Sequence, residues 1–415
     1  MKKILLSVTA LIVIAVSVLG AGLSINPYFS TFKDASGNKY LVYSITPIVD
    51  LDFMKLGIGF NAYQTEIGGN FYYGYPGISP EASNSVLNAL NLNFLELDFG
   101  LVAGRYGLMS NQTFGLGTVM YRYNVPLAKA FDARLGEKNG LNIKAHAPFE
   151  IGSWIPFKLV QSASLAYADA QIPLGLIKVS ALGATNYLGS SNNKDMIASA
   201  NAYFDLFGLA LGVEGGYIMT SNSNTSVNTT GYGVAAGAGL DLNFFEMRIF
   251  PVAYMSKNYV MGYIDGNYEK GSTNYNALIA ADKERLGGIY DVAFTIPEVI
   301  TANVRYSYDL AIGENFDISK VQISNEKIYG TLAAVSPFEG YPFTAYGKYS
   351  RSFKGNEHIV DMIQNIFSAN TEFEYGISYS VVQGLNVSYV TFLDKLDGNN
   401  PVFGSRIDLG AELSF

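Results

Sequence analysis

Few residues in this 415-residue chain are of the types that carry out catalysis. Cysteine is absent and histidine occurs twice, at His146 and His358. A hydrolase needs a nucleophile and a base, or an acid and a base, held close together. His146 has no such partner in the segment 144–147, and His358 fits a short loop helix with solvated charges. We therefore expect that the protein is not an enzyme.

Ligand-binding motifs are equally sparse. The chain has no phosphate-binding loop, no dinucleotide-binding glycine pattern and no Cys/His spacing typical of a metal site. The segment 397–400 (Asp-Gly-Asn-Asn) is more typical of a plain turn than of a weak calcium site. A formal net charge of −8 argues against a basic nucleic-acid surface. These observations predict no metal, no cofactor and no nucleic-acid partner.

The composition separates the chain from ordinary soluble proteins. Hydrophobic residues make up 49% and charged residues only 15%, against about 25% charged residues in soluble domains. Yet beyond residue 22 no apolar run approaches the ~18 residues that a membrane helix needs. The apolar residues alternate instead with Gly, Ser, Asn and Thr. A membrane β-barrel has this pattern, because each strand turns one face to lipid and the other to the lumen.

The last segment, 406–415, is the clearest expected strand. Its apolar residues Ile407, Leu409, Leu413 and Phe415 fall on one face because side chains alternate along a strand. It ends on Phe415 and so resembles the C-terminal assembly signal of outer-membrane barrels, in which the final residue is typically Phe. This resemblance implies that Phe415 is recognised by the barrel-assembly machinery.

Short turns divide the rest of the chain into strands. A related pattern recurs at 49–56, 90–97 and 240–247, where Asn or Asp between apolar residues favours a tight turn. A strand on each side of every turn predicts an all-β, antiparallel transmembrane barrel. We expect about eighteen strands, with sixteen to twenty as alternatives, in a single domain over residues 22–415.

The third outer loop, at about 108–160, is the longest and holds an expected helix at 125–135. In this topology the chain resembles diffusion porins, whose long third loop commonly folds inward and narrows the lumen. The likeness is architectural and carries no functional residues across. With the loop inward, the candidate constriction residues are Arg122, Asp132, Arg134 and Glu137, whose opposed charges would filter permeants. With the loop outside, the same residues form the charged face of an extracellular cap.

Strand alternation also assigns charged residues to the lumen. The acids are Glu96, Asp98, Glu246, Asp309, Glu372, Glu374, Asp408 and Glu412, and the bases are Arg248, Arg305 and Arg406. The excess of acids predicts a mild preference for cations. In the alternative interpretation, these charges pair across strands and only stiffen the wall.

The expected function is a porin-like channel for passive diffusion of small hydrophilic solutes and ions. Inward glycines at 233, 237, 239 and 376 favour an open lumen. The alternative is a non-conducting structural or adhesive barrel that anchors surface loops, in which the tyrosines of loop 258–286 form a contact surface.

The N-terminus predicts export. Lys2 and Lys3 precede an apolar run at 4–19 and small residues at 20–22, the layout of a cleaved signal peptide over residues 1–21. With the barrel, this predicts the outer membrane of a diderm bacterium, contact with outer-membrane lipid, and a surface compatible with a homotrimer.

Overall fold

The structure is a computed structural model. It describes residues 22–33, 39–66, 68–74, 85, 89–108, 112–123, 139–146, 149–156, 165–186, 193–222, 227–242, 247–258, 262–265, 268, 284–313, 317–336, 343–353, 357–368, 370–382, 385–411 and 413–414. This part of the chain contains 22 strands in one sheet and the short 3-10 helix η5. No helix among the described residues is long and apolar enough to cross a membrane.

The first strands are β1 (Gly22–Lys33), β2 (Lys39–Leu51), β3 (Met54–Gln64), β4 (Tyr72–Tyr73), β5 (Leu90–Asp98), β6 (Val102–Leu108), β7 (Asn139–His146), β8 (Glu150–Pro156), β9 (Ala166–Leu174), β10 (Ile177–Thr185) and β11 (Asn193–Leu206). They are followed by β12 (Leu209–Asn222), β13 (Val227–Leu242), β14 (Met247–Lys257), β15 (Glu284–Ile296), β16 (Ile300–Gly313), β17 (Asp317–Val335), β18 (Phe343–Ser352), η5 (Ile359–Ile363), β19 (Thr371–Val382), β20 (Leu385–Asp397), β21 (Asn400–Ala411) and β22 (Leu413–Ser414).

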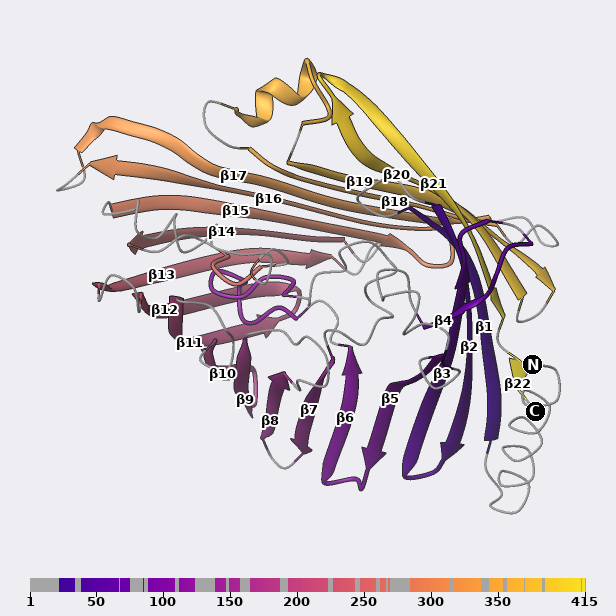
Figure 1. Cartoon of the computed structure of the whole chain (residues 1–415). Coiled ribbons are helices and arrows are strands. Elements are labelled where there is room, and N and C mark those ends of the chain that lie inside the picture. Colours follow the sequence, from indigo (N-terminus) through magenta and orange to yellow (C-terminus); the bar gives the residue numbers. More distant parts are fainter. Residues whose placement is uncertain are drawn as a thin grey trace.

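The sheet closes on itself. From β5 to β21 each strand pairs with its neighbour in the chain, and β3 pairs directly with β5. The ring is completed where β1 pairs with β21 and β22, at Tyr28↔Gly410 and Ser24↔Ser414. Figure 1 shows the strands following one another around the barrel in chain order. Closure joins the first and last strands of the described sheet, and lipid would penalise an open edge there by several kcal/mol per unpaired backbone group. The predicted antiparallel barrel is confirmed.

The outer face of the wall is apolar. On β12, Leu209, Leu211 and Val213 are exposed, whereas the alternate residues Ala210 and Glu214 are buried toward the interior. Similar exposed apolar side chains occur on β8, β13, β14 and β21. A barrel with this exterior is suited to a hydrocarbon surrounding.

The count of 22 strands is higher than the expected eighteen and than the range of sixteen to twenty, which only the count of longer strands meets. Two of the 22 strands, β4 and β22, are two residues long, which leaves twenty longer strands in the described part. The additional pair is the hairpin of β7 and β8, which lies inside the segment 108–160 predicted to be the third outer loop. Ile143 and Ile151 face outward on this hairpin, but nearby lysines and Glu150 obscure its apolar alternation in the sequence.

One predicted turn is wrong. The segment 90–97 was expected to turn at its asparagines, but it runs straight through β5. Its register with β3 shifts between Gly57 and Ile58, and the Asn93 side chain donates to Thr46 Oγ1 at 2.8 Å. The asparagine amide thus stabilises a bulge. The turn follows at Gly100, whose φ is +80° and whose N–H donates to Asp98 Oδ1 at 2.8 Å.

The buried core lies inside the barrel rather than within a second layer. Thirteen buried apolar residues form one cluster, contributed by wall strands β8 to β12 and by loop segments 112–123 and 262–265. Figure 1 shows these loop segments, in purple and salmon, inside the curve of the sheet beside β10–β13. The lumen therefore contains ordered chain on one side, and this places the candidate site.

Candidate functional site

The segment 112–123 forms a compact turn structure inside the lumen, here called the inward hairpin. Its ends are joined by reciprocal backbone hydrogen bonds between Gln112 and Tyr123, at 2.7 and 2.8 Å. Further in, Phe114 N–H donates to Met120 O at 3.1 Å, and Gly117 N–H donates to Phe114 O at 2.9 Å. Left-handed glycines make this tight path possible, since Gly117 has a φ of +74°.

A single wall carboxylate binds the tip of the inward hairpin. Glu214 lies on the inner face of β12 and is almost fully buried. Its oxygens accept hydrogen bonds from the N–H groups of Leu116 at 2.6 Å, Val119 at 3.3 Å and Thr118 at 3.5 Å. The Ser199 hydroxyl on β11 donates to the same carboxylate at 3.2 Å. Backbone amides that converge on one anion form charge-assisted bonds, which are stronger than neutral ones.

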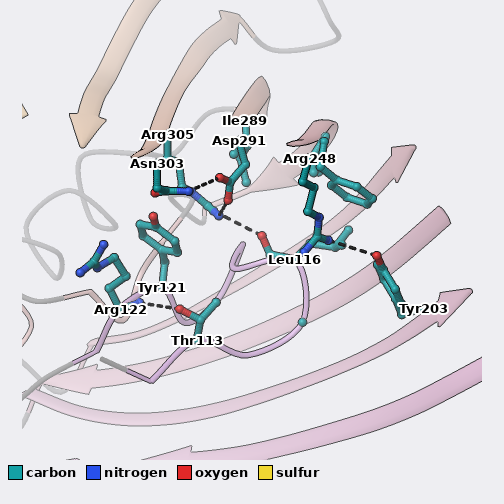
Figure 2. Close-up of a pocket in the computed structure, with 13 residues that line it drawn as sticks. Thr113, Leu116, Tyr121, Arg122, Tyr203, Arg248, Ile289, Asp291, Asn303 and Arg305 are labelled. Carbon is teal, nitrogen blue, oxygen red and sulfur yellow. Dashed lines mark hydrogen bonds and ion pairs between the residues drawn. The ribbon is translucent and has the colours of Figure 1, made fainter. Parts of the chain in front are cut away.

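A wall guanidinium holds the same tip from the other side. Arg305 on β16 is buried, and its Nη2 donates to the carbonyls of Gly117 at 3.1 Å and Leu116 at 3.3 Å. Its Nη1 lies 3.5 Å from Asp291 Oδ2 on β15. Figure 2 shows Arg305 between Asp291 and the hairpin. The hairpin tip therefore presents N–H groups to an acid and C=O groups to a base.

An aromatic ring completes the Arg305 contact. The guanidinium carbon lies 3.6 Å from the centre of the Tyr121 ring, close enough for a cation–π interaction. Burial raises the pKa of the Tyr121 phenol above its ordinary value, and the positive charge of Arg305 partly offsets this rise. Tyr121 is therefore neutral at physiological pH, and Asp291 is the carboxylate that lies against the guanidinium.

Apolar packing fixes the rest of the inward hairpin. Phe114, Val119, Met120 and Tyr123 are buried in the large cluster with Trp154 and other wall residues. Leu116 joins a second cluster with residues of β12 to β15. Burying side chains of this size stabilises the packed state by about 1.5–3 kcal/mol each.

A second loop segment lies on the first. Met120 and Ile264 form a parallel bridge, and Ile264 N–H donates to Val119 O at 2.9 Å. Asp265 of this segment pairs with Lys327 on β17 at 2.8 Å. Tyr268 donates to Asp195 on β11 at 2.6 Å. These contacts tie the segment to two separated parts of the wall.

The tyrosine placement corrects one expectation. In the adhesive alternative, the tyrosines of loop 258–286 form an outer contact surface. Tyr263 is instead buried in the cluster inside the barrel, and Tyr268 packs against it. Tyr275 lies outside the described residues.

A cavity of about 360 Å³ lies between the inward hairpin and the wall. Its lining includes Arg122 from the hairpin, with Arg248, Asp291 and Arg305 from the wall. Figure 2 shows Arg248 opposite the hairpin, where it donates to the Tyr203 hydroxyl at 3.1 Å. The cavity is thus bounded by opposed charges with basic groups in excess, and such charges can orient and filter a passing solute.

The predicted constriction residues are only partly placed. Arg122 lies on the inward hairpin, with a φ of +50°, and its guanidinium carbon is 3.7 Å from the centre of the Tyr329 ring. Asp132, Arg134 and Glu137, and the expected helix at 125–135, lie outside the described residues. Their role in a constriction therefore stays a prediction.

The predicted lumen charges take several different positions. Arg248 and Arg305 border the cavity. Ion pairs across strands hold Glu96 to Arg105 at 3.1 Å, Asp309 to Arg285 at 3.6 Å, and Glu374 to Arg406 at 3.2 Å. Arg406 also pairs with Asp408 at 3.0 Å, Asp98 lies at the β5–β6 turn, and Glu372 is exposed on β19. Glu246, Glu412 and Phe415 lie outside the described residues.

Two of the inward glycines do not open the lumen as expected. A Cβ atom on Gly237 would lie 2.5 Å from the Phe250 ring, and one on Gly376 would lie 2.6 Å from the Tyr346 ring. The absent glycine side chains therefore make room for neighbouring aromatic rings. These glycines support close packing of the wall rather than a wide passage.

Glu214, Asp291 and Tyr121 were not identified from the sequence. The sequence does indicate that Glu214 is an inward-facing acid. The alternation in 209–213 places residue 214 on the inner face, and no basic residue lies beside it in the chain. Its partners are backbone N–H groups about a hundred residues earlier in the chain. Residue types in the sequence do not identify such partners, because every non-proline residue has a backbone N–H. Among the described residues, no group of three or more His, Asp or Glu is placed to hold a metal ion.

Comparisons with known proteins give a likeness in solved structures alone. No protein-family model matches the chain, and no curated protein sequence matches it. The chain is similar to OccK5 (OpdH) of Pseudomonas aeruginosa, with a TM-score of 0.43 and 8% identity, covering 95% of this chain and 98% of that chain.

Two further structures show a similar degree of likeness. One is the outer membrane protein opdK of Pseudomonas aeruginosa, and the other is OccAB4 of Acinetobacter baumannii. Each has a TM-score of 0.38 and 10% identity, covering 95% of this chain and 98% of that chain. At such low identity no functional residue is carried across, and the function rests on this chain's own geometry.

Proposed function

We propose that the protein is a passive outer-membrane channel for small hydrophilic solutes, narrowed by the inward hairpin. The observation that carries this proposal is the hairpin tip held on the inner wall by Glu214 and Arg305. A barrel of about sixteen or more strands is wide enough for an aqueous lumen, whereas eight strands leave an interior that side chains fill. An inward segment fixed on one side of such a lumen reduces its cross-section without requiring chemistry or energy input.

The fixed charges beside the hairpin would filter solutes. Arg122, Arg248 and Arg305 line the cavity together with Asp291, which pairs with Arg305, so the local field is that of a basic patch with one acid in it. Elsewhere the lumen face carries an excess of acids among the predicted charges. We therefore propose a mild overall cation preference that is weakest next to the inward hairpin. A reversal potential in a salt gradient that indicates anion preference would rule this out.

The proposal extends to export and assembly. Residues 1–21 would be removed as a signal peptide, and the barrel-assembly machinery would recognise the C-terminal strand ending at Phe415. A homotrimer is supported by a flat aromatic surface on the exterior of β15 and β16, where Tyr290, Tyr306 and Tyr308 stack with ring centres 5.8 to 6.4 Å apart. The mass of the detergent-solubilised mature chain would distinguish a trimer from a monomer.

Liposome swelling tests the channel directly. Proteoliposomes containing the refolded mature chain are diluted into isotonic sugars of increasing size, with protein-free liposomes as the control. We expect fast swelling with the smallest sugars and a steep decline with size, since the narrowed lumen excludes larger solutes. Swelling no faster than in protein-free liposomes, from protein that shows full β-structure, would contradict the proposal.

One observation favours the alternative of a non-conducting structural barrel. The loop segments at 112–123 and 262–265 bury a large apolar cluster inside the lumen, and blocked barrels are filled by loops and bulky side chains. The charged cavity beside the hairpin argues against complete filling. The swelling assay separates the two functions, because a filled barrel admits none of the sugars.

A further inference from the structure

The loop after β18 covers part of the outer wall. Residues 357–368, here called the outer cover, include η5 and lie at the end of the barrel opposite the two termini (Figure 1). The register shows which face the cover occupies. Arg351 on β18 pairs with Ile328 on β17, which pairs with Tyr306 on β16 and then with Tyr290 on β15. Tyr290 is half exposed on the exterior, and directly paired residues share a face, so Arg351 also points outward.

The outer cover binds two charged groups on this exterior face. Arg351 is only 2% exposed, and its Nη1 donates to the carbonyls of Asn365 and Ile366. Its Nη2 lies 3.4 Å from a Glu357 carboxylate oxygen. Without the cover, this guanidinium would face the surroundings of the barrel, where a lipid environment would penalise an unpaired charge.

A buried acid on the neighbouring strand, Glu326, also contacts the outer cover. Glu326 on β17 accepts a hydrogen bond from the Tyr306 hydroxyl at 2.6 Å, and its other oxygen lies 2.8 Å from His358 Nδ1. The sequence suggested solvated charges for His358, but the structure places this side chain on the barrel wall. The cover is therefore bound through polar groups on its inner side.

Aromatic packing joins the outer cover to aromatic residues on the exterior of β19 and β21. Phe367 contacts Phe373 on β19 and Phe403 on β21, with ring centres 5.4 and 5.5 Å apart. The Tyr349 hydroxyl, also on the exterior face, donates to Ile366 O at 2.7 Å. Aromatic belts of this kind lie at the membrane–water interface of β-barrels. The cover is thus continuous with the wall surface that contacts lipid.

Three apolar side chains of the cover are well exposed, beside the polar Gln364 and Asn365. Val360 is 64% exposed, Ile363 is 89% exposed and Ile366 is 54% exposed. We propose that the outer cover is a membrane-interface element, in which Val360, Ile363 and Ile366 contact acyl chains of the outer leaflet. The same element shields Arg351 and Glu326 from that lipid. This proposal rests on the barrel being in a membrane and not on conduction.

The absence of cysteine makes a clean labelling experiment possible. Ile363→Cys carries an environment-sensitive fluorophore in proteoliposomes, and quenching by nitroxide lipids is compared with quenching by aqueous iodide. Ile377→Cys, on the exposed outer face of β19, gives the lipid reference. Asn399→Cys, in the exposed turn between β20 and β21, gives the water reference. Heat-dependent gel mobility verifies that each variant is folded.

We expect the Ile363→Cys probe to behave like the lipid reference, with strong quenching by shallow nitroxide lipids and several-fold weaker quenching by iodide than at Asn399→Cys. Iodide quenching equal to that at Asn399→Cys would overturn the proposal. Shielding from both quenchers would also overturn it, because a protein surface would then cover the site. Swelling activity of the same proteoliposomes has no bearing on either outcome.

Discussion

The inward hairpin depends on one carboxylate and one guanidinium. Glu214 accepts three backbone N–H groups from the hairpin tip, while Arg305 donates to two of its carbonyls. Both side chains are buried, so water cannot replace these bonds at little cost. Removal of either group leaves polar backbone atoms unsatisfied on the hairpin.

Glu214→Gln tests the carboxylate. The amide keeps the size of the side chain but places an NH₂ donor against hairpin N–H groups. Each donor left unsatisfied costs about 1–3 kcal/mol, so the hairpin should detach part of the time. We expect larger and more fluctuating current steps in planar bilayers than for the unmodified chain.

The matched control for this substitution is Glu96→Gln, since Glu96 pairs with Arg105 across β5 and β6. The current steps of this control should fluctuate no more than those of the unmodified chain. If Glu214→Gln also gave unchanged steps, the carboxylate would not be what holds the hairpin.

The path of the inward hairpin requires glycine at two positions, Gly115 and Gly117. Gly117 has a left-handed φ of +74°, and a Cβ atom there would lie 2.9 Å from Arg305 Nη2. A side chain would therefore both strain the turn and displace the guanidinium. Left-handed conformation costs a non-glycine residue about 1–2 kcal/mol.

Gly117→Ala should therefore loosen the inward hairpin without opening the barrel. Hydrogen exchange measured by mass spectrometry should show faster exchange in the peptide that contains 114–120, with β12 and β16 unchanged. Gly183→Ala on β10 is the control, because nothing lies within 4 Å of its Cβ position. Equal protection of the hairpin in both variants would contradict the assigned role of Gly117.

Most strands can be predicted from the sequence, but the β7–β8 hairpin and the bulge in β5 cannot. Alternation predicts strands such as β12 and β21, because each has one face in lipid and one in the lumen. The β7–β8 hairpin was missed because its polar inner face resembles a charged loop. The bulge in β5 depends on Asn93 reaching Thr46 across the sheet, and local patterns carry no information about such a partner.

The candidate site is harder to predict than the strands. The sequence places Arg122, Arg248 and Arg305 near the lumen, since strand alternation and loop length are local properties. The attachment of Gly117 and Leu116 to wall strands β12 and β16 is not local. This attachment forms only when the third loop folds into the lumen. Glu214 and Arg305 then bond to backbone groups of the hairpin and not to its side chains.

For the whole molecule, closure between the first and last strands determines whether a barrel exists. Phe29 on β1 is paired with Leu409 on β21. Directly opposed residues have Cα atoms about 4.5–5.5 Å apart, inside the range of about 4.4–6.8 Å that a disulfide requires. The chain contains no other cysteine to interfere.

The double variant Phe29→Cys/Leu409→Cys should form an intramolecular disulfide under mild oxidation of the folded protein. Loss of free thiols and a reductant-sensitive gel shift of the denatured chain would report it. Phe29→Cys/Phe403→Cys is the control, because Phe403 lies farther along β21 and outside bonding distance. Cross-linking with equal yield in both variants would show that the first and last strands are not held in this register.

The single-channel conductance of the refolded mature chain in a planar lipid bilayer shows most directly whether the lumen conducts. A lumen narrowed but not filled by the inward hairpin predicts stable, discrete current steps of uniform size. A protein that inserts with full β-structure yet conducts no current would contradict this claim and favour the non-conducting barrel, whose loop segments close the lumen.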